Sequence, residues 1–172
     1  MQFKEIDLTT MQLNPFNMFH EEWGLVAAGT EGKRNTMTVG WGALGVLWAK
    51  PVAIVFIRPQ RFTKEFVEES GKFTLSFYSR EYRKALELLG TKSGRDGDKI
   101  AESGLTPWFT DGTVAFEEAE LVFVCNKVFG GQQFDASKFI GDEIPGRMYP
   151  GKDFHYFYVG EIEKAYEKGT GT

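Results

Sequence analysis

The stretch that decides the fold is Pro51-Val52-Ala53-Ile54-Val55-Phe56-Ile57-Arg58-Pro59. Its centre, Val52–Ile57, is an apolar run held between two prolines. A run of this length is too short for a free-standing helix, and it is rich in β-branched residues. It therefore predicts a strand with both faces covered.

Similar short runs of apolar and β-branched residues lie on both sides of this segment, and the turn signal Asp111-Gly112 precedes one of them. They predict five further strands. These strands are Trp23–Ala28, Thr36–Gly40, Phe73–Phe77, Leu121–Phe129 and His155–Ile162. So many short strands are typical of a barrel or a sandwich.

Three short helices are expected between the strands, each with a capping residue at its start and a glycine at its end. They are Thr63–Glu69, Ser79–Leu89 and Asp98–Ser103, with caps at Thr63, Ser79 and Asp98 and stops at Gly71, Gly90 and Gly104. The predicted fold class is mainly β, a β-rich α+β domain with a few short helices.

The composition is that of one folded domain. The chain has 20 basic and 24 acidic residues, a net charge of −4, and 42% hydrophobic residues. We expect a single domain over residues 1–167 and a flexible tail over 168–172. The acidic balance argues against nucleic-acid binding, and the uncharged stretch Val39–Ala49 is too short and too rich in glycine to span a membrane. The sole cysteine cannot form an intrachain disulfide, and we expect a cytoplasmic protein.

The segment Gly40-Trp41-Gly42-Ala43-Leu44-Gly45 fits the pattern G-x-G-x-x-G. In a dinucleotide-binding fold this pattern lies between a strand and a helix. Pro51 follows too closely to leave room for that helix, so the Rossmann interpretation is disfavoured. The glycines instead predict a bend in a barrel strand or a place where a flat ligand approaches the backbone.

Two polar segments are candidates for anion binding. In Ile57–Lys64, two arginines and a threonine lie where the buried strand passes into a helix, so guanidinium groups and free backbone N–H groups converge. The alternative is an N-cap with two solvated arginines. Lys92–Lys99 is a glycine-rich, charged loop that enters the next helix, and it fits a phosphate contact and a set of turn and cap residues equally well.

Metal and hydrolase chemistry have little support in the sequence. Neither His20 nor His155 has a second histidine at metal-ligand spacing, so no metal site is expected. No G-x-S-x-G elbow is present. Cys125 lies in an apolar alternating segment and is expected to pack as an inert thiol.

Four short motifs follow one another along most of the chain. They are Asn35–Thr38 with Trp41-Gly42, then Ile57–Thr63, then Ser93–Lys99, and finally His155 followed by Gly160-Glu161-Ile162. In this order they resemble the flavin reductase-like, FMN-binding split-barrel family, which includes flavoredoxins. The resemblance implies a split β-barrel that forms a homodimer, with one FMN per subunit in a groove near the interface.

The resemblance also implies that FMN contacts come from these segments. The matching residues are Arg58, Arg61 and Thr63 for the phosphate, with Phe62 as a further cofactor contact in the same segment. They are Asn35, Thr36, Met37 and Thr38 for the edge of the isoalloxazine ring, Trp41 and Gly42 beside the ring, and Ser93, Gly94 and Lys99 for a second phosphate or ribityl contact.

His155 is the candidate catalytic residue, because it matches a family histidine beside the flavin pocket. Its expected role is nicotinamide contact or proton supply, and the alternative is a structural histidine at a strand end. Tyr149 and Tyr156 are candidates to reach the site from the second subunit. Residues 130–152 match no motif and are expected to shape substrate access.

The activity that the resemblance implies is hydride transfer from NADH or NADPH to flavin and on to a small acceptor. One alternative is a flavoredoxin-like electron carrier, in which a redox protein partner reduces tightly bound FMN. A split-barrel module without flavin is a further alternative. The sequence indicates neither which nicotinamide donor is used nor which acceptor.

Overall fold

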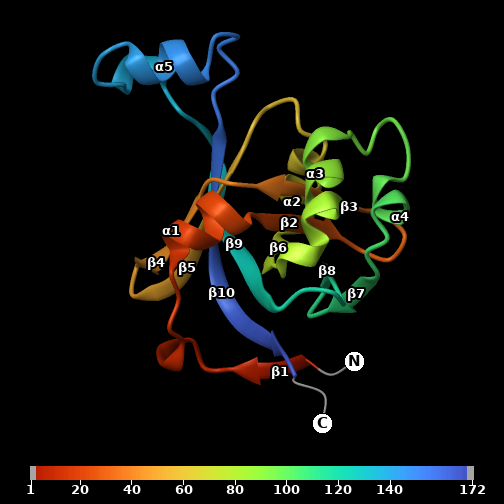
Figure 1. Cartoon of the computed structure of the whole chain (residues 1–172). Coiled ribbons are helices and arrows are strands. Elements are labelled where there is room, and N and C mark those ends of the chain that lie inside the picture. Colours follow the sequence, from red (N-terminus) through yellow and green to blue (C-terminus); the bar gives the residue numbers. More distant parts are fainter. Residues whose placement is uncertain (1–2, 170–172) are drawn as a thin grey trace.

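The computed structural model describes residues 3–169 as ten strands and five α-helices (Figure 1). The strands are β1 (Phe3–Ile6), β2 (Gly24–Gly29), β3 (Arg34–Val39), β4 (Gly42–Leu47), β5 (Lys50–Ile57), β6 (Lys72–Phe77), β7 (Pro107–Thr110), β8 (Thr113–Phe116), β9 (Leu121–Gln133) and β10 (Tyr156–Lys168). The helices are α1 (Pro15–Asn17), α2 (Thr63–Ser70), α3 (Arg83–Thr91), α4 (Lys99–Ser103) and α5 (Glu143–Met148). Short turns of 3-10 or π type cover Leu8–Thr10, Met18–Glu22, Arg80–Tyr82 and Ala136–Lys138.

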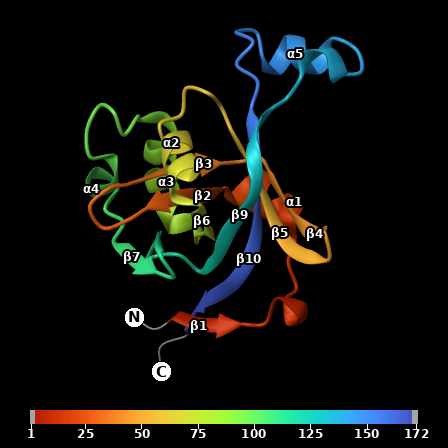
Figure 2. The same cartoon turned by 180° about the vertical axis from the view of Figure 1, so that it is seen from behind.

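Eight of the strands form one sheet in the order β3-β2-β6-β9-β10-β5-β4, with β1 paired to the end of β10. Every pairing in this sheet is antiparallel. Its centre is the pair β9–β10, whose ladder is interrupted by three register shifts. Irregularities of this kind bend and twist a strand, and the sheet curves around an apolar interior (Figures 1 and 2). The predicted β-rich class is confirmed.

Strand β2 contributes side chains to two separate hydrophobic cores, one on each face of the sheet. Val26 and Ala28 face the inner core together with Phe73, whereas Leu25 and Ala27 face an outer core beneath α3, α4 and β8. All five side chains are fully buried. Because side chains alternate along a strand, a strand with two covered faces reads as a continuous apolar run. This accounts for the many short apolar segments in the sequence.

The predicted strands are all present, but the last two are longer than expected. β9 continues to Gln133, and β10 continues to Lys168. The run Val52–Ile57 lies in β5, between β10 and β4. The sequence does not predict β1, β4, β7 or β8, which have four to six residues each.

Three of the helix-end predictions are confirmed. The Asp98 side chain accepts a hydrogen bond from the Ala101 N–H at 3.0 Å and so caps α4. Gly71 and Gly104 adopt left-handed conformations at the C-terminal ends of α2 and α4.

Two other helix-end predictions are wrong, and one is confirmed in position only. Thr63 is the first residue of α2 rather than its N-cap, and its buried hydroxyl accepts a hydrogen bond from Asn35. Ser79 occupies the N-cap position of the 3-10 turn that leads into α3, but its hydroxyl donates to the Glu81 side chain and makes no capping hydrogen bond. Gly90 does not end α3, which continues to Thr91.

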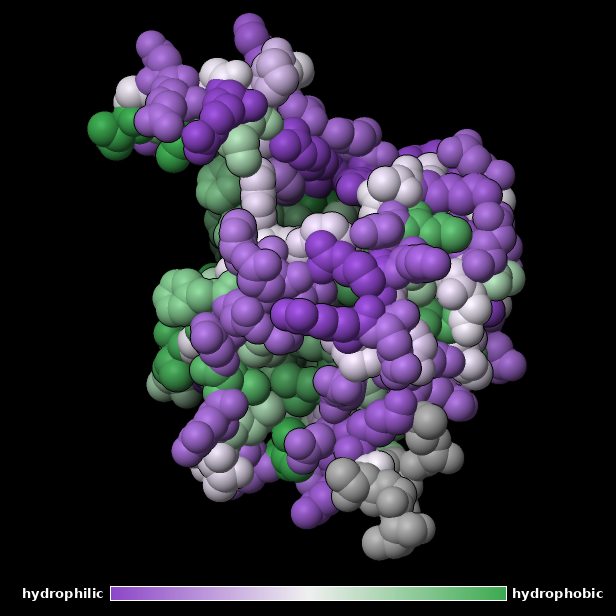
Figure 3. All heavy atoms as spheres, viewed as in Figure 1, coloured by the Kyte–Doolittle hydropathy of each residue, from purple (hydrophilic) through white to green (hydrophobic). Residues whose placement is uncertain are grey.

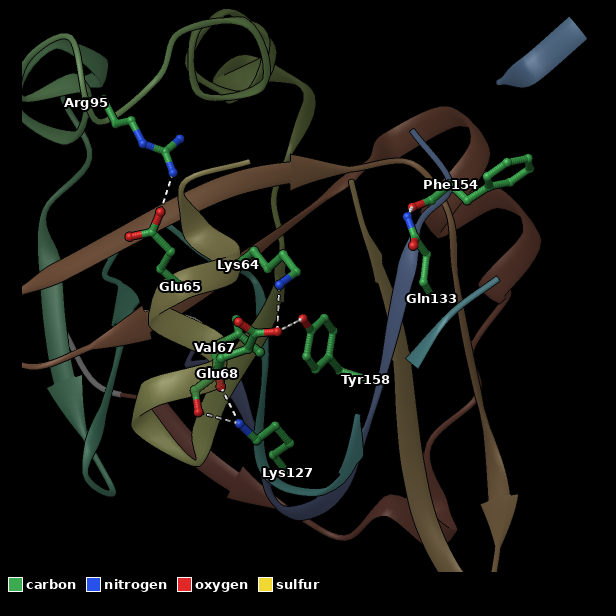
Figure 4. Close-up of polar contacts among 9 residues, drawn as sticks. All are labelled: Lys64, Glu65, Val67, Glu68, Arg95, Lys127, Gln133, Phe154 and Tyr158. Carbon is green, nitrogen blue, oxygen red and sulfur yellow. Dashed lines mark hydrogen bonds and ion pairs between the residues drawn. The ribbon is translucent and has the colours of Figure 1, made fainter. Parts of the chain in front are cut away.

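Helix α2 is tied to the two central strands (Figure 4). The Tyr158 hydroxyl donates to Glu68 Oε1 at 2.8 Å, and Lys64 Nζ donates to the same oxygen at 2.7 Å. Lys127 Nζ donates to the backbone carbonyls of Val67 and Glu68 at 2.8 and 2.7 Å. The last carbonyls of a helix lack partners within the helix, so Lys127 satisfies two of them. These contacts fix the position of α2 on the sheet.

Between β9 and β10 the chain forms an arm, residues 134–155, which carries α5 beyond the sheet (Figures 1 and 2). Gln133 Nε2 donates to the Phe154 carbonyl at 2.9 Å and closes the base of this arm (Figure 4). Within the arm the ring centroid of Phe154 lies 5.6 Å from that of Phe139 and 4.7 Å from that of Tyr149. The arm is therefore an ordered element with its own small aromatic cluster.

None of the helices within residues 3–169 is long and apolar enough to cross a membrane. The predicted tail over 168–172 lies largely outside the described residues, and β10 extends through Lys168.

Gly160, part of the fourth motif, lies where β10 passes over the inner core. A Cβ atom at this position would lie 2.6 Å from Cys125 Cβ and 2.6 Å from Phe73 Cζ. Only glycine therefore fits without moving the core. Gly32, in the exposed turn between β2 and β3, is the opposite case, because a Cβ atom there would meet nothing within 4 Å.

We expect Gly160→Ala to lower the free energy of unfolding by about 1–3 kcal/mol, the usual cost of overpacking a core. Urea denaturation followed by tryptophan fluorescence measures this change. Gly32→Ala is the control at an open position and should stay within about 0.5 kcal/mol of the wild type. Equal stabilities of the two variants would contradict the close packing at Gly160.

Candidate functional site

The turn between β5 and α2 carries Arg58 and Arg61. The Arg61 N–H donates to the Arg58 carbonyl at 3.1 Å, so the turn is tight. A cavity of about 370 Å³ opens beside it, and we call this the basic cavity. Its lining residues are Met37, Arg58, Gln60, Arg61, Phe62, Thr63, Gly90, Thr91, Lys92, Ser93, Gly94 and Lys99.

The lining of the basic cavity contains four basic side chains and, within residues 3–169, no acidic one. The Arg61 guanidinium donates to the Gly90 carbonyl at 2.5 Å, and in the described part of the chain it forms no ion pair with a carboxylate. Burial, together with the positive charge of Arg58, lowers the pKa of Arg61. Positive charge that is partly buried without a counterion is costly, so this cavity is suited to an anion.

Lys99 contributes a deeply buried amine to the same cavity. Its side chain is 3% exposed, and Nζ donates to the carbonyls of Leu89 and Lys92 at 3.0 Å each. These carbonyls lie at the C-terminal end of α3, where a cation is favoured. Desolvation, together with the charge of Arg61, lowers the pKa of Lys99 to about 8. The helix end thus holds the amine at the cavity wall.

Ser93 and Gly94 reach the basic cavity on the loop between α3 and α4. A Cβ atom at Gly94 would lie 2.7 Å from Asn35 Oδ1, so glycine lets the loop pack closely against β3. The Arg95 guanidinium pairs with Glu65 on α2 (Figure 4). The loop and the β5–α2 turn are therefore held together as two walls of one site.

A second cavity, of about 190 Å³, adjoins the first and shares Met37, Arg58 and Arg61 with it. We call it the aromatic cavity. Its lining residues are Met37, Thr38, Val39, Gly40, Trp41, Phe56, Arg58, Arg61 and His155. The indole of Trp41 is partly exposed, and its centroid lies 5.0 Å from that of the His155 ring. The two cavities thus join a basic region to one with flat apolar walls.

His155 is buried at the edge of the aromatic cavity, with 8% of its surface exposed. Its Nδ1 lies 2.9 Å from the Tyr149 hydroxyl of the same chain. Burial, with the nearby charge of Arg58 and a further contribution from Arg61, lowers the pKa of His155 to about 4. The imidazole is therefore neutral at pH 7. This environment favours a role as a neutral hydrogen-bonding group over proton release from an imidazolium.

Arg58 belongs to both cavities and also holds the arm. Its guanidinium donates to Asp153 Oδ2 at 2.6 Å and to the Met148 carbonyl at 2.9 Å. Its Cζ lies 5.0 Å from the centroid of the Tyr149 ring. Arg58 is therefore shared between a ligand site and the segment that carries His155.

Three predicted residues lie outside these two cavities. Thr36 is fully buried, and its hydroxyl donates to a backbone carbonyl of β2. Gly42 packs against Phe19, because a Cβ atom there would lie 2.3 Å from that ring. Asn35 is buried beside the basic cavity, and its Nδ2 donates to Thr63 Oγ1 at 3.2 Å. In the structure these three residues thus make packing contacts or hydrogen bonds with neighbouring parts of the chain and do not line either cavity.

The structure brings the other predicted residues together at the two cavities, and it adds some that the sequence analysis missed. One of these is Phe56, which lines the aromatic cavity. Side chains alternate along the strand Val52–Ile57, so Phe56 could have been placed on the face opposite Val55 from the sequence alone. Asp153 could not be placed in this way, because it lies in the arm, where no motif is recognisable.

A family model described as "Flavin reductase like domain" matches residues 17–170. An FMN-binding domain of a flavin reductases-like enzyme from Shewanella baltica OS155 superposes with a TM-score of 0.68 at 16% identity, covering 96% of this chain and 77% of that chain. A flavoredoxin from Methanosarcina acetivorans has a TM-score of 0.68 at 24% identity, covering 92% and 75%. An FMN-binding protein from Thermus thermophilus, solved with bound 1-cyclohex-2-enone, has a TM-score of 0.66 at 21% identity, covering 87% and 73%. A search of the curated proteins found no match.

The similar structures confirm the split-barrel fold that the four motifs predict. The family model spans both cavities and nearly the whole of the sheet. The chain belongs to the flavin reductase-like domain family.

Proposed function

We propose that this protein binds FMN and oxidises NADH or NADPH, delivering the electrons to free flavin or another small acceptor. The observation that carries the proposal is the junction of the basic cavity with the aromatic cavity at Met37, Arg58 and Arg61. Membership of the flavin reductase-like family supports it. The Shewanella and Thermus proteins are described as an FMN-binding domain and an FMN-binding protein.

The basic cavity fits the phosphate end of FMN. A phosphate monoester carries close to two negative charges and accepts several hydrogen bonds. Arg61 offers guanidinium donors with no competing carboxylate within the described residues, and Lys99 offers a buried amine. Ser93 and Thr63 line the same cavity with hydroxyl groups. These residues would hold the phosphate and the start of the ribityl chain.

The aromatic cavity fits the flat end of the cofactor. Trp41 and Phe56 supply apolar walls, and Thr38, Val39 and Gly40 place the end of β3 beside them. When bound, FMN supplies a ring system that takes up and releases electrons in pairs. The protein's own task is to bind, orient and partly shield that ring.

A flavoredoxin-like electron carrier is the second candidate function, because the fold is shared with the Methanosarcina flavoredoxin. In that case FMN stays bound and a redox protein partner reduces it. The cavities described above serve both functions equally, so the difference lies in the electron donor.

One experiment separates these functions. FMN is added to the dialysed protein, the absorption spectrum is recorded, and NADH, NADPH and then dithionite are added without oxygen. Bleaching of bound flavin by a nicotinamide supports the reductase and identifies its donor. Bleaching by dithionite alone supports the carrier. A flavin spectrum that the protein leaves unchanged would overturn both.

We further propose a homodimer that uses the β4–β5 hairpin. β4 is an edge strand, and Val46 and Trp48 on this hairpin are 77% and 57% exposed. Phe129, 45% exposed, has its ring centroid 6.4 Å from that of Trp48. Hydrophobic surface is visible on the side of the molecule where β4, β5 and α1 lie (Figure 3). Apolar edge strands and large apolar patches favour association.

The turn of the same hairpin supports this interpretation. Trp48 and Ala49 have φ angles of 53° and 58°, in the left-handed region that non-glycine residues rarely adopt. Two positive φ angles are what the central pair of a two-residue β-hairpin turn requires, so they follow from the tight connection between β4 and β5. This turn holds the Trp48 side chain out at the tip of the hairpin, where it is available for contact with a second chain.

We expect Arg61→Ala to weaken FMN binding by about 1.5–3 kcal/mol, because it removes a charge-assisted hydrogen bond to the phosphate. Fluorescence titration measures the dissociation constant. Riboflavin, which lacks the phosphate, is the matched ligand and should lose little affinity. Equal losses for FMN and riboflavin would place Arg61 away from the phosphate.

We expect FMN affinity to fall about tenfold as the pH is raised from 7 to 9, a change of about 1.4 kcal/mol. In the free protein the pKa of Lys99 is about 8, and a bound phosphate would raise it. FMN binding therefore takes up a proton above pH 8 and none well below it. Riboflavin titrations over the same range are the control and should be nearly flat. An FMN profile as flat as that of riboflavin would exclude Lys99 from the phosphate contact.

We expect a dimer in light scattering at micromolar concentration, and we expect Trp48→Asp to shift the mass toward the monomer. A charge buried in an apolar contact is costly. Phe109→Asp, at a partly exposed aromatic residue on β7, is the matched control and should leave the mass unchanged. A monomeric wild type would refute the proposed interface.

A further inference from the structure

Tyr149 and His155 form a buried hydrogen-bonded pair inside one chain. Tyr149 is 6% exposed and His155 is 8% exposed, and the Tyr149 hydroxyl lies 2.9 Å from His155 Nδ1. Their ring centroids are 5.6 Å apart in an edge-to-face arrangement. The proposed function gives His155 a place beside the ligand and leaves Tyr149 without a role.

We infer that Tyr149 is a positioning residue: its hydroxyl donates to Nδ1 of His155, so that the imidazole carries its proton on Nε2 and offers this N–H to the aromatic cavity. The acceptor would be a carbonyl oxygen or an unprotonated ring nitrogen of the planar ligand held there. The ligand part of this inference rests on the proposed function, whereas the tautomer does not.

The direction of the Tyr149–His155 hydrogen bond follows from the partners available. Within the described residues Nδ1 is the only acceptor that the Tyr149 hydroxyl reaches, because its other contact, the backbone N–H of His155, is a donor. If Nδ1–H donated to the tyrosine oxygen, the buried hydroxyl proton would be left without an acceptor, which costs free energy. Burial raises the pKa of Tyr149, so the hydroxyl keeps its proton. A neutral imidazole with an accepting Nδ1 must carry its proton on Nε2.

Nε2 of His155 is free to meet a ligand. His155 lines the aromatic cavity beside Trp41, and no hydrogen bond to Nε2 is found within residues 3–169. The only hydrogen-bond partner of the ring in that range, Tyr149, contacts the other nitrogen. The N–H is therefore an available donor at the wall of the cavity.

The segment that carries the pair is clamped at both ends by Arg58. The guanidinium donates to the Met148 carbonyl next to Tyr149 and to Asp153 two residues before His155. Charged groups that face the imidazole are Arg58 and Arg61, with Asp153 opposing them. Two cations against one carboxylate disfavour the imidazolium, so the pair stays in its neutral form at pH 7.

The test is nitrogen NMR of the imidazole groups in the full-length protein without added flavin. The chain has 2 histidines, and His20 is solvent-exposed, with 85% of its side chain accessible, so it serves as an internal reference. We expect wild-type His155 at pH 7 to show a protonated Nε2 and an unprotonated Nδ1. In Tyr149→Phe both nitrogens should move toward the averaged values of a tautomer mixture, while His20 stays unchanged.

Tyr156→Phe is the matched control, because it removes a hydroxyl next to His155 for which no hydrogen bond is found among the described residues, and it should leave the tautomer as in the wild type. A wild-type His155 protonated on Nδ1 would overturn the inference. So would a Tyr149→Phe spectrum identical to that of the wild type. The wild-type spectrum alone decides the hydrogen-bond direction if Tyr149→Phe does not fold.

Titration of the wild type with FMN tests the ligand-facing role. We expect the Nε2 signal of His155 to shift on saturation and the tautomer to stay the same. Flavin that binds without moving this signal would overturn the donor role. A flavin absorption spectrum that the protein leaves unchanged would instead overturn the proposed function, and the tautomer would still decide whether Tyr149 positions His155.

Discussion

The antiparallel register of β5 and β10 is the constraint on which the site depends. Ile57 pairs with Tyr156, and this pairing sets Arg58 next to His155 although the two residues are far apart in the sequence. Because side chains alternate along a strand, a slip of one residue would turn every side chain of β10 to the opposite face. The register is enforced from both sides: Val55 and Ile57 belong to the inner core, and Gly160 admits Phe73 against β10. Core packing thus fixes the distance between His155 and the turn that carries the two arginines.

Arg58 and Arg61 place two positive charges in one partly buried turn, and the two side chains have different partners. Burial, and to a smaller extent the charge of Arg58, lowers the pKa of Arg61. Arg58 is neutralised by Asp153 and so becomes a structural clamp on the arm. Arg61 contacts only a backbone carbonyl among the described residues. The charge that remains uncompensated therefore lies at Arg61 and Lys99, and this is the part of the turn that an anion would stabilise most.

Features that depend on residues close together in the sequence were predictable, whereas contacts between residues far apart in the sequence were not. The run Val52–Ile57 and the cap at Asp98 depend on neighbouring residues, and both are confirmed. Thr63 was predicted as an N-cap because a threonine at a helix start usually accepts a hydrogen bond from a free backbone N–H of that helix. Its hydroxyl instead accepts a hydrogen bond from the side-chain amide of Asn35 on β3. The cavities likewise depend on contacts between residues far apart in the sequence. The arginines of the turn form a recognisable pattern, whereas residues 130–152 match no motif. The contribution of the arm depends on which of its side chains contact Arg58 after folding.

The two cavities differ in the charge of the groups that line them, because one carries additional cationic side chains and the other a neutral imidazole. The cations that suit a phosphate lie in the basic cavity, and their field reaches His155, where together with burial it lowers the pKa of the imidazole to about 4. A histidine that was cationic at neutral pH would add a third positive charge beside Arg58 and Arg61 and would strengthen the repulsion within the site. A neutral imidazole avoids this cost and still offers one N–H. Which nitrogen carries that proton is then decided by a single buried hydroxyl, that of Tyr149. The positive charge that forms the basic cavity thus adds to burial in keeping His155 neutral, and the arm contributes the hydroxyl that fixes the tautomer of the neutral ring.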